Sequence, residues 1–235
     1  MTLPLVSNEN GSFSSIPSDA AELDRTLPVR QPYWLRNRGA PALKVGRAGV
    51  RATWIGHATV LAEVDGTVVI TDPIFIQRAS AVQWMGPKRY RPPGKLIDIY
   101  LFFFYIISRF LSTACTIAEL PPELRAVVIS HNHYDHLDYN SVNDLHAKYG
   151  SDLHWFVPKD MGSWFTGNFG IQSANVHELV WWEREVVPGT NTSIVLTPSN
   201  HWGRRGPFDE NKALWGSYAI IGPQNRYERV KQSIN

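Results

Sequence analysis

The stretch that most constrains this sequence is an apolar run that ends at a cluster of ionisable side chains. Residues 126–129 read Ala-Val-Val-Ile, and a run of this kind predicts a buried strand. The residues that follow it include His131, His133, Asp135 and His136. Because successive side chains of an extended segment alternate, the first two histidines can converge on one point, and the Asp-His pair can face a second. Imidazole and carboxylate are zinc-type ligands, so this spacing predicts a site for two metal ions.

A polar turn that is rich in histidine by chance is the alternative interpretation of this loop. Three histidines and an aspartate within six residues serve no packing purpose. They are also costly to bury unless they are solvated or coordinated. We therefore interpret residues 131–136 as a metal-binding loop, called the metal loop below.

Two more polar residues are candidates for a supporting role. Asp72 follows the predicted strand 67–70 at its carboxyl end, the edge where the sites of layered α/β folds gather. His57 precedes it in the same predicted hairpin. We expect both to lie behind metal ligands, with a plain structural role as the alternative for His57. The histidines of later segments are expected to be structural or exposed, namely His146, His154 and His177.

Composition indicates one folded domain and excludes several classes of partner. The 235 residues are 43% hydrophobic and 12% aromatic, which is typical of a folded protein with a sizeable core. A net charge of +2 from 23 basic and 21 acidic residues is too balanced to favour nucleic acid. The single cysteine, Cys115, excludes an internal disulfide framework, and residues 1–17 do not have the pattern of a signal peptide. These features predict a cytoplasmic protein.

The order of predicted elements indicates a layered α/β domain. Residues 1–30 are rich in Ser, Asn and Pro and are expected to form a disordered arm ahead of a domain that spans 31–226. Strands are predicted at 50–55, 59–64, 67–70, 126–129, 155–157, 176–179, 193–197 and 214–221, and helices at 140–149 and 161–169. Such alternation is typical of α/β folds, and the last of these strands is followed by a divergent tail, 227–235.

Several motifs in order resemble the N-acylphosphatidylethanolamine-hydrolysing phospholipase D family of the metallo-β-lactamase superfamily. The H-x-H-x-D-H spacing alone is similar to the superfamily, and the whole set, spread over about residues 30–226, is similar to this branch. The motifs are Trp54–Thr59, Thr71–Phe75, Gly86–Tyr90, His131–Ser141, Trp155–Pro158, Trp181–Glu183, Thr197–Trp202 and Leu214–Ser217. The resemblance implies an αββα sandwich whose second half is incomplete in this sequence, since the bridging aspartate and last histidine of the superfamily have no counterpart after Arg226.

An apolar block at residues 95–114 has no counterpart in this resemblance. Its unbroken apolar core, Ile99–Ile107, is too short to span a bilayer, which takes about 20 residues. A membrane-inserting or interfacial segment, a buried strand or helix, and sequence foreign to the domain are three interpretations. We favour the third, because family members join the preceding loop directly to the segment at 115–122. We expect this insert to lie outside the core.

The resemblance also implies a ligand set. His131, His133 and His201 correspond to the ligands of a first zinc, and Asp135 and His136 to ligands of a second. Asp135 is also the catalytic candidate, since it can orient the attacking water. Two zinc ions are the family pattern. Because Asp135 and His136 alone hold an ion weakly, we expect one zinc to be retained here.

The function that the resemblance implies is zinc-dependent hydrolysis of N-acylphosphatidylethanolamine to N-acylethanolamine and phosphatidic acid. Its partner would be a phospholipid at a membrane surface, with the protein peripheral on the cytoplasmic side and with a tendency to form homodimers. Two alternatives stay open. One is another hydrolase of the same superfamily, and the other is a truncated, non-catalytic product that binds lipid or zinc.

Overall fold

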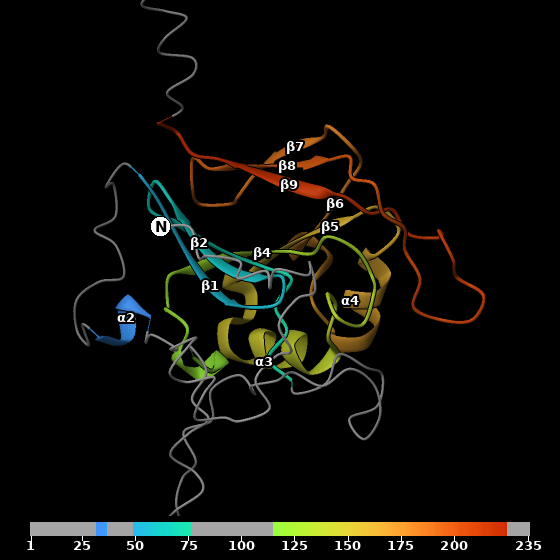
Figure 1. Ribbon diagram of the computed structural model, residues 1–235, viewed down its shortest axis with the longest axis horizontal. Coiled ribbons are helices and arrows are strands. Elements are labelled where there is room, and N and C mark those ends of the chain that lie inside the picture. Colours follow the sequence, from blue (N-terminus) through green and yellow to red (C-terminus); the bar gives the residue numbers. More distant parts are fainter. Residues whose placement is uncertain (1–31, 37–48, 77–114, 225–235) are drawn as a thin grey trace, which may run out of the picture.

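A computed structural model describes residues 32–36, 49–76 and 115–224 (Figure 1). The predicted arm 1–30, the insert 95–114 and the tail 227–235 lie outside these residues, so this division of the chain stays a prediction. Within the described part, no helix is both long and apolar enough to cross a membrane.

Among residues 32–36, 49–76 and 115–224, nine strands form two sheets. The first sheet has the order β1-β2-β3-β4-β5-β6. Strands β1, β2 and β3 pair antiparallel, and the pairing is parallel from β3 to β6. The second sheet, β7-β8-β9, is antiparallel throughout. The strands are β1 Val50–Gly56, β2 Thr59–Val64, β3 Thr67–Thr71, β4 Leu124–Val128, β5 His154–Pro158, β6 Val176–Leu179, β7 Arg184–Val186, β8 Ser193–Thr197 and β9 Ser217–Ile221.

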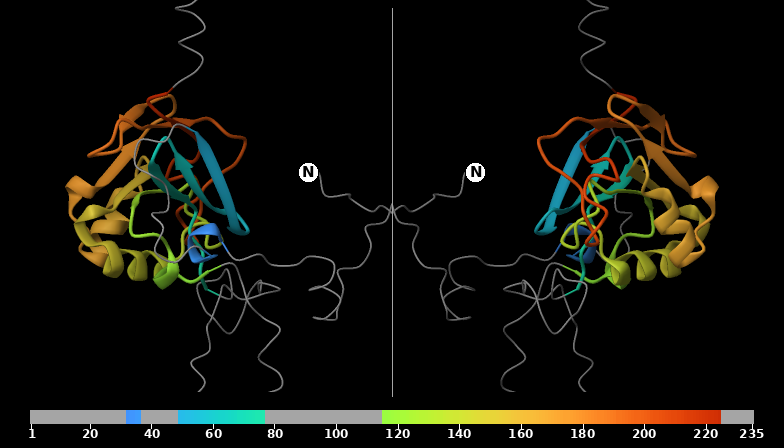
Figure 2. Two further views of the ribbon diagram at one scale, coloured as in Figure 1. Left: turned by 90° about the vertical axis from the view of Figure 1, so that its left-hand side faces the viewer. Right: turned by 90° about the vertical axis from the view of Figure 1, so that its right-hand side faces the viewer.

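In the described part of the chain, helices cover one face of the six-stranded sheet (Figure 1). The two longer helices are α3, Tyr139–Tyr149, and α4, Gly162–Phe169, and each connects neighbouring parallel strands. Shorter turns are α2 Tyr33–Arg36, η2 Ile117–Glu119, η3 Gly150–Asp152 and η4 Ser173–Asn175. The second sheet lies on the opposite face, so the described residues form helix, sheet and sheet layers (Figures 1 and 2). These layers confirm the predicted α/β sandwich, and no described helix covers the outer face of β7–β9 (Figure 1).

The alternation of side chains along the central strands separates two cores. On β4 and β5, Val127 and Trp155 point to the helical layer, where they pack with Leu145 and Phe165. Their neighbour Phe156 points the other way. The second core joins the sheets through Val69, Ala126, Val128, Phe156, Leu179, Val187, Ile194 and Leu196. A strand buried on both faces must be apolar at every position, which explains the run that the sequence shows at 126–129.

Tyr218 fixes the second sheet against the ends of two central strands. Its hydroxyl lies 3.0 Å from the carbonyl oxygen of Ile129 and 3.1 Å from that of Phe156, so it can donate to either. Burial raises the pKa of the Tyr218 phenol well above its usual value, so the group stays a donor. The link holds β9 beside the carboxyl end of β4, where the metal loop begins.

Most of the predicted elements are confirmed, with two corrections. The strand predicted at 214–221 begins only at Ser217, because Leu214 and Gly216 donate their backbone N–H groups to the carbonyl oxygens of Lys159 and Ser130. These bonds tie the segment to loops of the first sheet and take it out of the ladder. Strand β7 was not predicted, since its three residues, Arg-Glu-Val, show no apolar pattern.

Candidate metal centre

The metal loop leaves the carboxyl end of β4 and is closed by its own backbone. The N–H groups of His136 and Leu137 both lie within bonding distance of the His133 carbonyl oxygen, at 3.1 and 2.8 Å. Asp138 then ends the loop by accepting a hydrogen bond from the backbone N–H of Ser141 at 2.7 Å, which caps α3. The loop is therefore a tight turn held between a buried strand and a capped helix.

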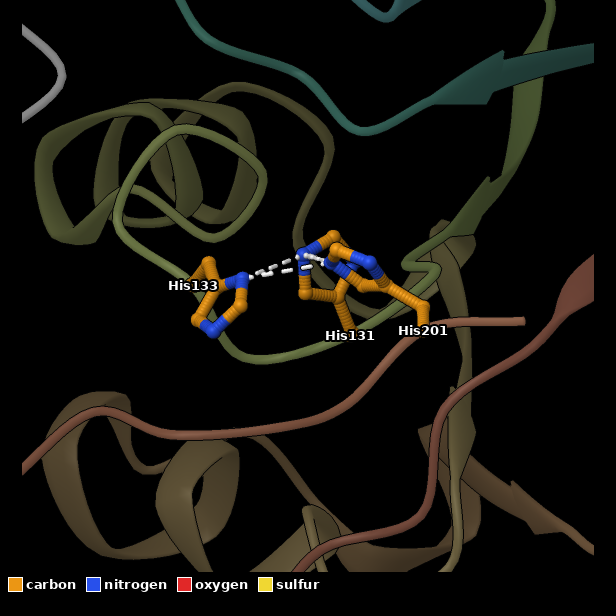
Figure 3. Close-up of side chains that lie close together, drawn as sticks. All are labelled: His131, His133 and His201. Atoms are coloured by element: carbon orange, nitrogen blue, oxygen red, sulfur yellow. Dashed lines mark hydrogen bonds between the residues drawn. The ribbon is translucent and has the colours of Figure 1, made fainter. Parts of the chain in front are cut away.

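The first donor cluster consists of His131, His133 and His201. His131 Nε2 lies 2.9 Å from His133 Nδ1 and 2.8 Å from His201 Nε2, and His133 Nδ1 lies 3.3 Å from His201 Nε2. Figure 3 shows these nitrogens facing one another, with His201 contributed by the loop after β8. Ligands at about 2.0–2.1 Å from a tetrahedral zinc lie about 3.3 Å apart, so this triangle is close to the size that a metal requires.

The protonation of this cluster also suits a metal. Burial, followed by the neighbouring His136 and His201, lowers the pKa of His131 to about 3. Burial and His201 lower the pKa of His133 as well. Neutral imidazoles offer a lone pair to a cation, so the donor set fits a divalent metal. The outer nitrogen of His133, Nε2, is buried without a hydrogen-bond partner, which leaves Nδ1 as the nitrogen that the cluster uses.

The second donor cluster consists of His57, Asp135 and His136, whose ligand atoms lie within 4.8 Å of one another. Asp135 Oδ2 is 3.1 Å from His57 Nε2 and 3.5 Å from His136 Nε2. Burial alone would raise the pKa of Asp135, but His136, a backbone hydrogen bond and His57 hold it below its ordinary value. The carboxylate is therefore ionised at neutral pH, as a metal ligand must be.

The two donor clusters lie side by side, with His131 of the first next to His136 of the second. The ring centroids of His131 and His136 are 4.2 Å apart. Between them, Ser130 Oγ lies 2.9 Å from His131 Nδ1 and 3.3 Å from His136 Nδ1. Five residues predicted from the sequence as ligands thus meet at two adjacent points, and their role as metal ligands stays a prediction.

Comparison with known proteins places this arrangement in a family. Residues 106–227, just over half of the sequence, match the family described as the beta-lactamase superfamily domain. The chain belongs to this superfamily.

The chain is also similar to individual curated proteins over most of its length. The chain is 36% identical to N-acyl-phosphatidylethanolamine-hydrolyzing phospholipase D 1 of Caenorhabditis elegans over 92% of this chain and 54% of that protein. It is 28% identical to the mitochondrial enzyme of the same name from Saccharomyces cerevisiae, over 87% of this chain and 44% of that protein. The chain thus spans about half the length of the curated relatives it matches. Among solved structures, a metallo hydrolase from Ignicoccus hospitalis matches 74% of this chain and 57% of its own, with 19% identity and a TM-score of 0.46.

Asp72 supports the superfamily's H-x-H-x-D-H loop from behind. Its Oδ1 accepts a hydrogen bond from the Ser130 backbone N–H at 2.7 Å, and Oδ2 lies 2.8 Å from His136 Nδ1. Burial acts to lower the pKa of His136, but the hydrogen bond and charge of Asp72 raise it above its ordinary value. The Asp72 side chain is buried and its backbone is left-handed, with φ +35°, a strain that sites of this kind tolerate. Asp72 thus lies directly behind His136, where it was expected, and its support of a bound metal stays a prediction.

Arg205 was not foreseen from the sequence, yet it holds the metal loop to the loop that carries His201. Its Nη1 donates to the carbonyl oxygens of Asn132 at 3.2 Å and Leu137 at 2.7 Å. The guanidinium carbon lies 4.3 Å from the ring centroid of Tyr134 and 4.9 Å from that of Trp164. In the sequence this residue stands in Gly-Arg-Arg-Gly, which reads as a solvated turn, so no local signal distinguishes it.

Proposed function

We propose that this chain forms the centre of a metal-dependent phosphodiester hydrolase that takes zinc and cleaves N-acylphosphatidylethanolamine to N-acylethanolamine and phosphatidic acid. The observation that carries the proposal is the meeting of two donor clusters from distant parts of the chain at two adjacent points. The likeness to phospholipases of that name in two organisms supports the substrate. Histidine and carboxylate donors without a thiolate suit zinc.

The chain's own residues have defined tasks in such a reaction. His131, His133 and His201 would hold one zinc, and Asp135 and His136 would contribute to a second. Bound zinc supplies a Lewis acid and lowers the pKa of a water toward neutrality. Asp135, whose side chain is 42% exposed, can accept a hydrogen bond from that water and orient it toward phosphorus. The water gives up a proton as its oxygen forms a new bond to phosphorus, the bond from phosphorus to the ethanolamine oxygen breaks, and the ethanolamine oxygen takes up a proton.

Exposed aromatic side chains support an action at a lipid surface. Trp54 is 69% exposed and donates its indole N–H to the His57 carbonyl oxygen at 2.8 Å. Trp202 is 42% exposed, with its ring centroid 4.5 Å from that of His133. Tryptophan favours the boundary between water and lipid, where its ring is apolar and its N–H is polar. We infer that the protein binds membranes peripherally with this side.

A hydrolysis assay on vesicles tests the proposal. The full chain is loaded with zinc and mixed with phosphatidylcholine vesicles that contain N-acylphosphatidylethanolamine, and both products are measured by mass spectrometry. We expect equal amounts of N-acylethanolamine and phosphatidic acid, loss of both after chelation, and sedimentation of the protein with the vesicles. His131→Ala should lower the rate by more than about a hundredfold, since it removes a ligand. His154→Ala should leave the rate unchanged, because His154 is in neither donor cluster and lies next to His177 instead.

Two results would overturn the proposal in different ways. Metal-dependent cleavage of a lactone or a simple phosphodiester without cleavage of the phospholipid would favour another hydrolase of the superfamily. A folded, zinc-loaded chain with no turnover of any of these compounds would favour a non-catalytic binding protein.

A further inference from the structure

His57 stands at a place where the chain is held in an unusual conformation. It lies in the turn between β1 and β2, where the register of the ladder shifts between Trp54 and Gly56. Its backbone is left-handed, with φ +50°, which is uncommon for a residue other than glycine. The Trp54 indole N–H holds the His57 carbonyl oxygen at 2.8 Å. The turn therefore fixes the imidazole of His57 in a defined direction at the cost of backbone strain.

That direction is toward the half-buried Asp135 and His136 of the metal loop. His57 Nε2 lies 3.1 Å from Asp135 Oδ2, and the ring centroids of His57 and His136 are 5.1 Å apart. The distance between His57 and Asp135 is near the separation of about 3.3 Å between two ligands of one tetrahedral zinc. A hydrogen bond between the two side chains would have the same length, so the other donors of the cluster must be considered.

The third donor, His136, presents a nitrogen that has a free lone pair. Its Nδ1 lies 2.8 Å from Asp72 Oδ2, and a carboxylate can only accept, so Nδ1 carries the proton. The lone pair of His136 is then on Nε2, the nitrogen that lies 3.5 Å from Asp135 Oδ2. This is the arrangement by which a carboxylate commonly fixes the tautomer of a metal-bound histidine. The two imidazoles and the carboxylate therefore bring their ligand atoms within 4.8 Å of one another.

We propose that His57 is a ligand of a second divalent cation, bound together with Asp135 and His136 beside the first donor cluster. Three protein ligands and a water complete a four-coordinate catalytic zinc, whereas the two ligands foreseen from the sequence hold an ion weakly. On this proposal we expect two bound ions, whereas the sequence alone led us to expect one. This inference deepens the proposed function, since it names a residue of the same centre.

Cobalt binding tests the inference without any assay of activity. The metal-free full chain is titrated with Co²⁺, and stoichiometry is measured from the visible absorption of the bound ion and from metal analysis. We expect two Co²⁺ per chain for the unmodified protein. His57→Ala and His57→Gln should keep one Co²⁺ and weaken the second by at least about tenfold. His154→Gln, a histidine change outside both clusters, should still bind two.

The glutamine variant separates a metal ligand from a mere hydrogen-bond partner. A glutamine amide can still donate to Asp135, but it is a poor zinc-type ligand compared with imidazole. Retention of the second Co²⁺ by His57→Gln or by His57→Ala would overturn the inference. A single Co²⁺ in the unmodified chain, held by the first cluster and lost in His201→Ala, would overturn this inference but not the proposed function. No Co²⁺ at all would also overturn the proposed function.

Discussion

Two groups of histidines in this molecule contain the same kind of carboxylate–imidazole pair and differ in what the far nitrogen faces. In the second donor cluster, Asp72 holds His136 Nδ1 at 2.8 Å, and His136 Nε2 faces the Asp135 carboxylate. In a distal cluster of His154, His177 and Glu185, the Glu185 carboxylate holds His177 Nδ1 at 2.6 Å. There, however, His177 Nε2 lies 3.0 Å from His154 Nδ1. The first arrangement leaves a lone pair directed at a shared point, and the second uses both nitrogens of its central histidine.

The difference follows from the position of each cluster in the sheets. His154 begins β5, and His177 lies within β6 and stacks on the ring of Phe156 at 4.5 Å. Glu185 comes from β7 in the other sheet, so the distal cluster is a chain of contacts that joins the two sheets. The metal-loop histidines follow a strand at its carboxyl end, where several loops can meet. Histidine content alone therefore does not distinguish the two clusters, and the difference lies in which nitrogen atoms are left without a hydrogen-bond partner among the described residues.

The largest expected effect is on metal affinity, and it should distinguish Asp72 from Glu185, the two carboxylates that hold a histidine. Asp72→Asn should weaken binding of the metal nearest His136 by about 10- to 100-fold, because the amide has no negative charge and keeps only one of the two acceptor oxygens that hold Ser130 and His136 Nδ1. Glu185→Gln makes the same chemical change in the distal cluster and should leave metal affinity unchanged. Competition with a coloured chelator measures both. The comparison would fail if the two variants lost metal to the same extent.

A smaller effect is expected from the residue that links the two loops of the metal centre. Arg205→Lys keeps the charge but loses the planar group that lies against Tyr134 and Trp164. We expect affinity for the first metal to fall by several-fold to about tenfold, since His201 is held less firmly relative to the metal loop. Arg204→Lys is the matched control, because Arg204 is solvent-exposed and its bonds to other described residues all lie within its own loop. Equal metal affinity of the two variants would show that the link is not needed for the site.

The smallest effect concerns the distal cluster and appears as a dependence of stability on pH. Burial, His177 and Arg125 lower the pKa of His154 from its ordinary value of 6.5. A lowered folded-state pKa means that the contribution of this group is present above pH 6.5 and is lost as the pH falls through the folded value. His154→Gln should therefore flatten the decline in unfolding free energy between pH 7.5 and 5.5. Urea unfolding of both metal-free proteins measures this, and parallel pH curves would contradict it.

Local patterns in the sequence accounted for the metal loop and most of the strands. The apolar run at 126–129 and the spacing of His131 and His133 depend on strand alternation, which acts between neighbours. His201 was assigned only through resemblance, because nothing near it in the sequence marks a ligand. Arg205 was missed since its burial is caused by rings from distant segments. His57 and the metal loop are likewise brought together by tertiary packing, since His57 and Asp135 are 78 residues apart in the sequence. The sequence therefore predicted a position near the site for His57 but did not identify it as a ligand.

The donors come from nearly the whole described chain, and this has a consequence for folding. His57 belongs to the first hairpin of the large sheet, and His201 to the loop that precedes the last strand of the small one. Four of the six donors lie within residues 131–136, but each cluster is completed by a distant histidine, so the unfolded chain binds a cation more weakly than the folded chain. Each bound ion would then act as a reversible cross-link to the metal loop, one from the first hairpin of the large sheet and the other from the loop after β8. At a free concentration of 100 times its dissociation constant, one ion stabilises the folded state by about 2.7 kcal/mol.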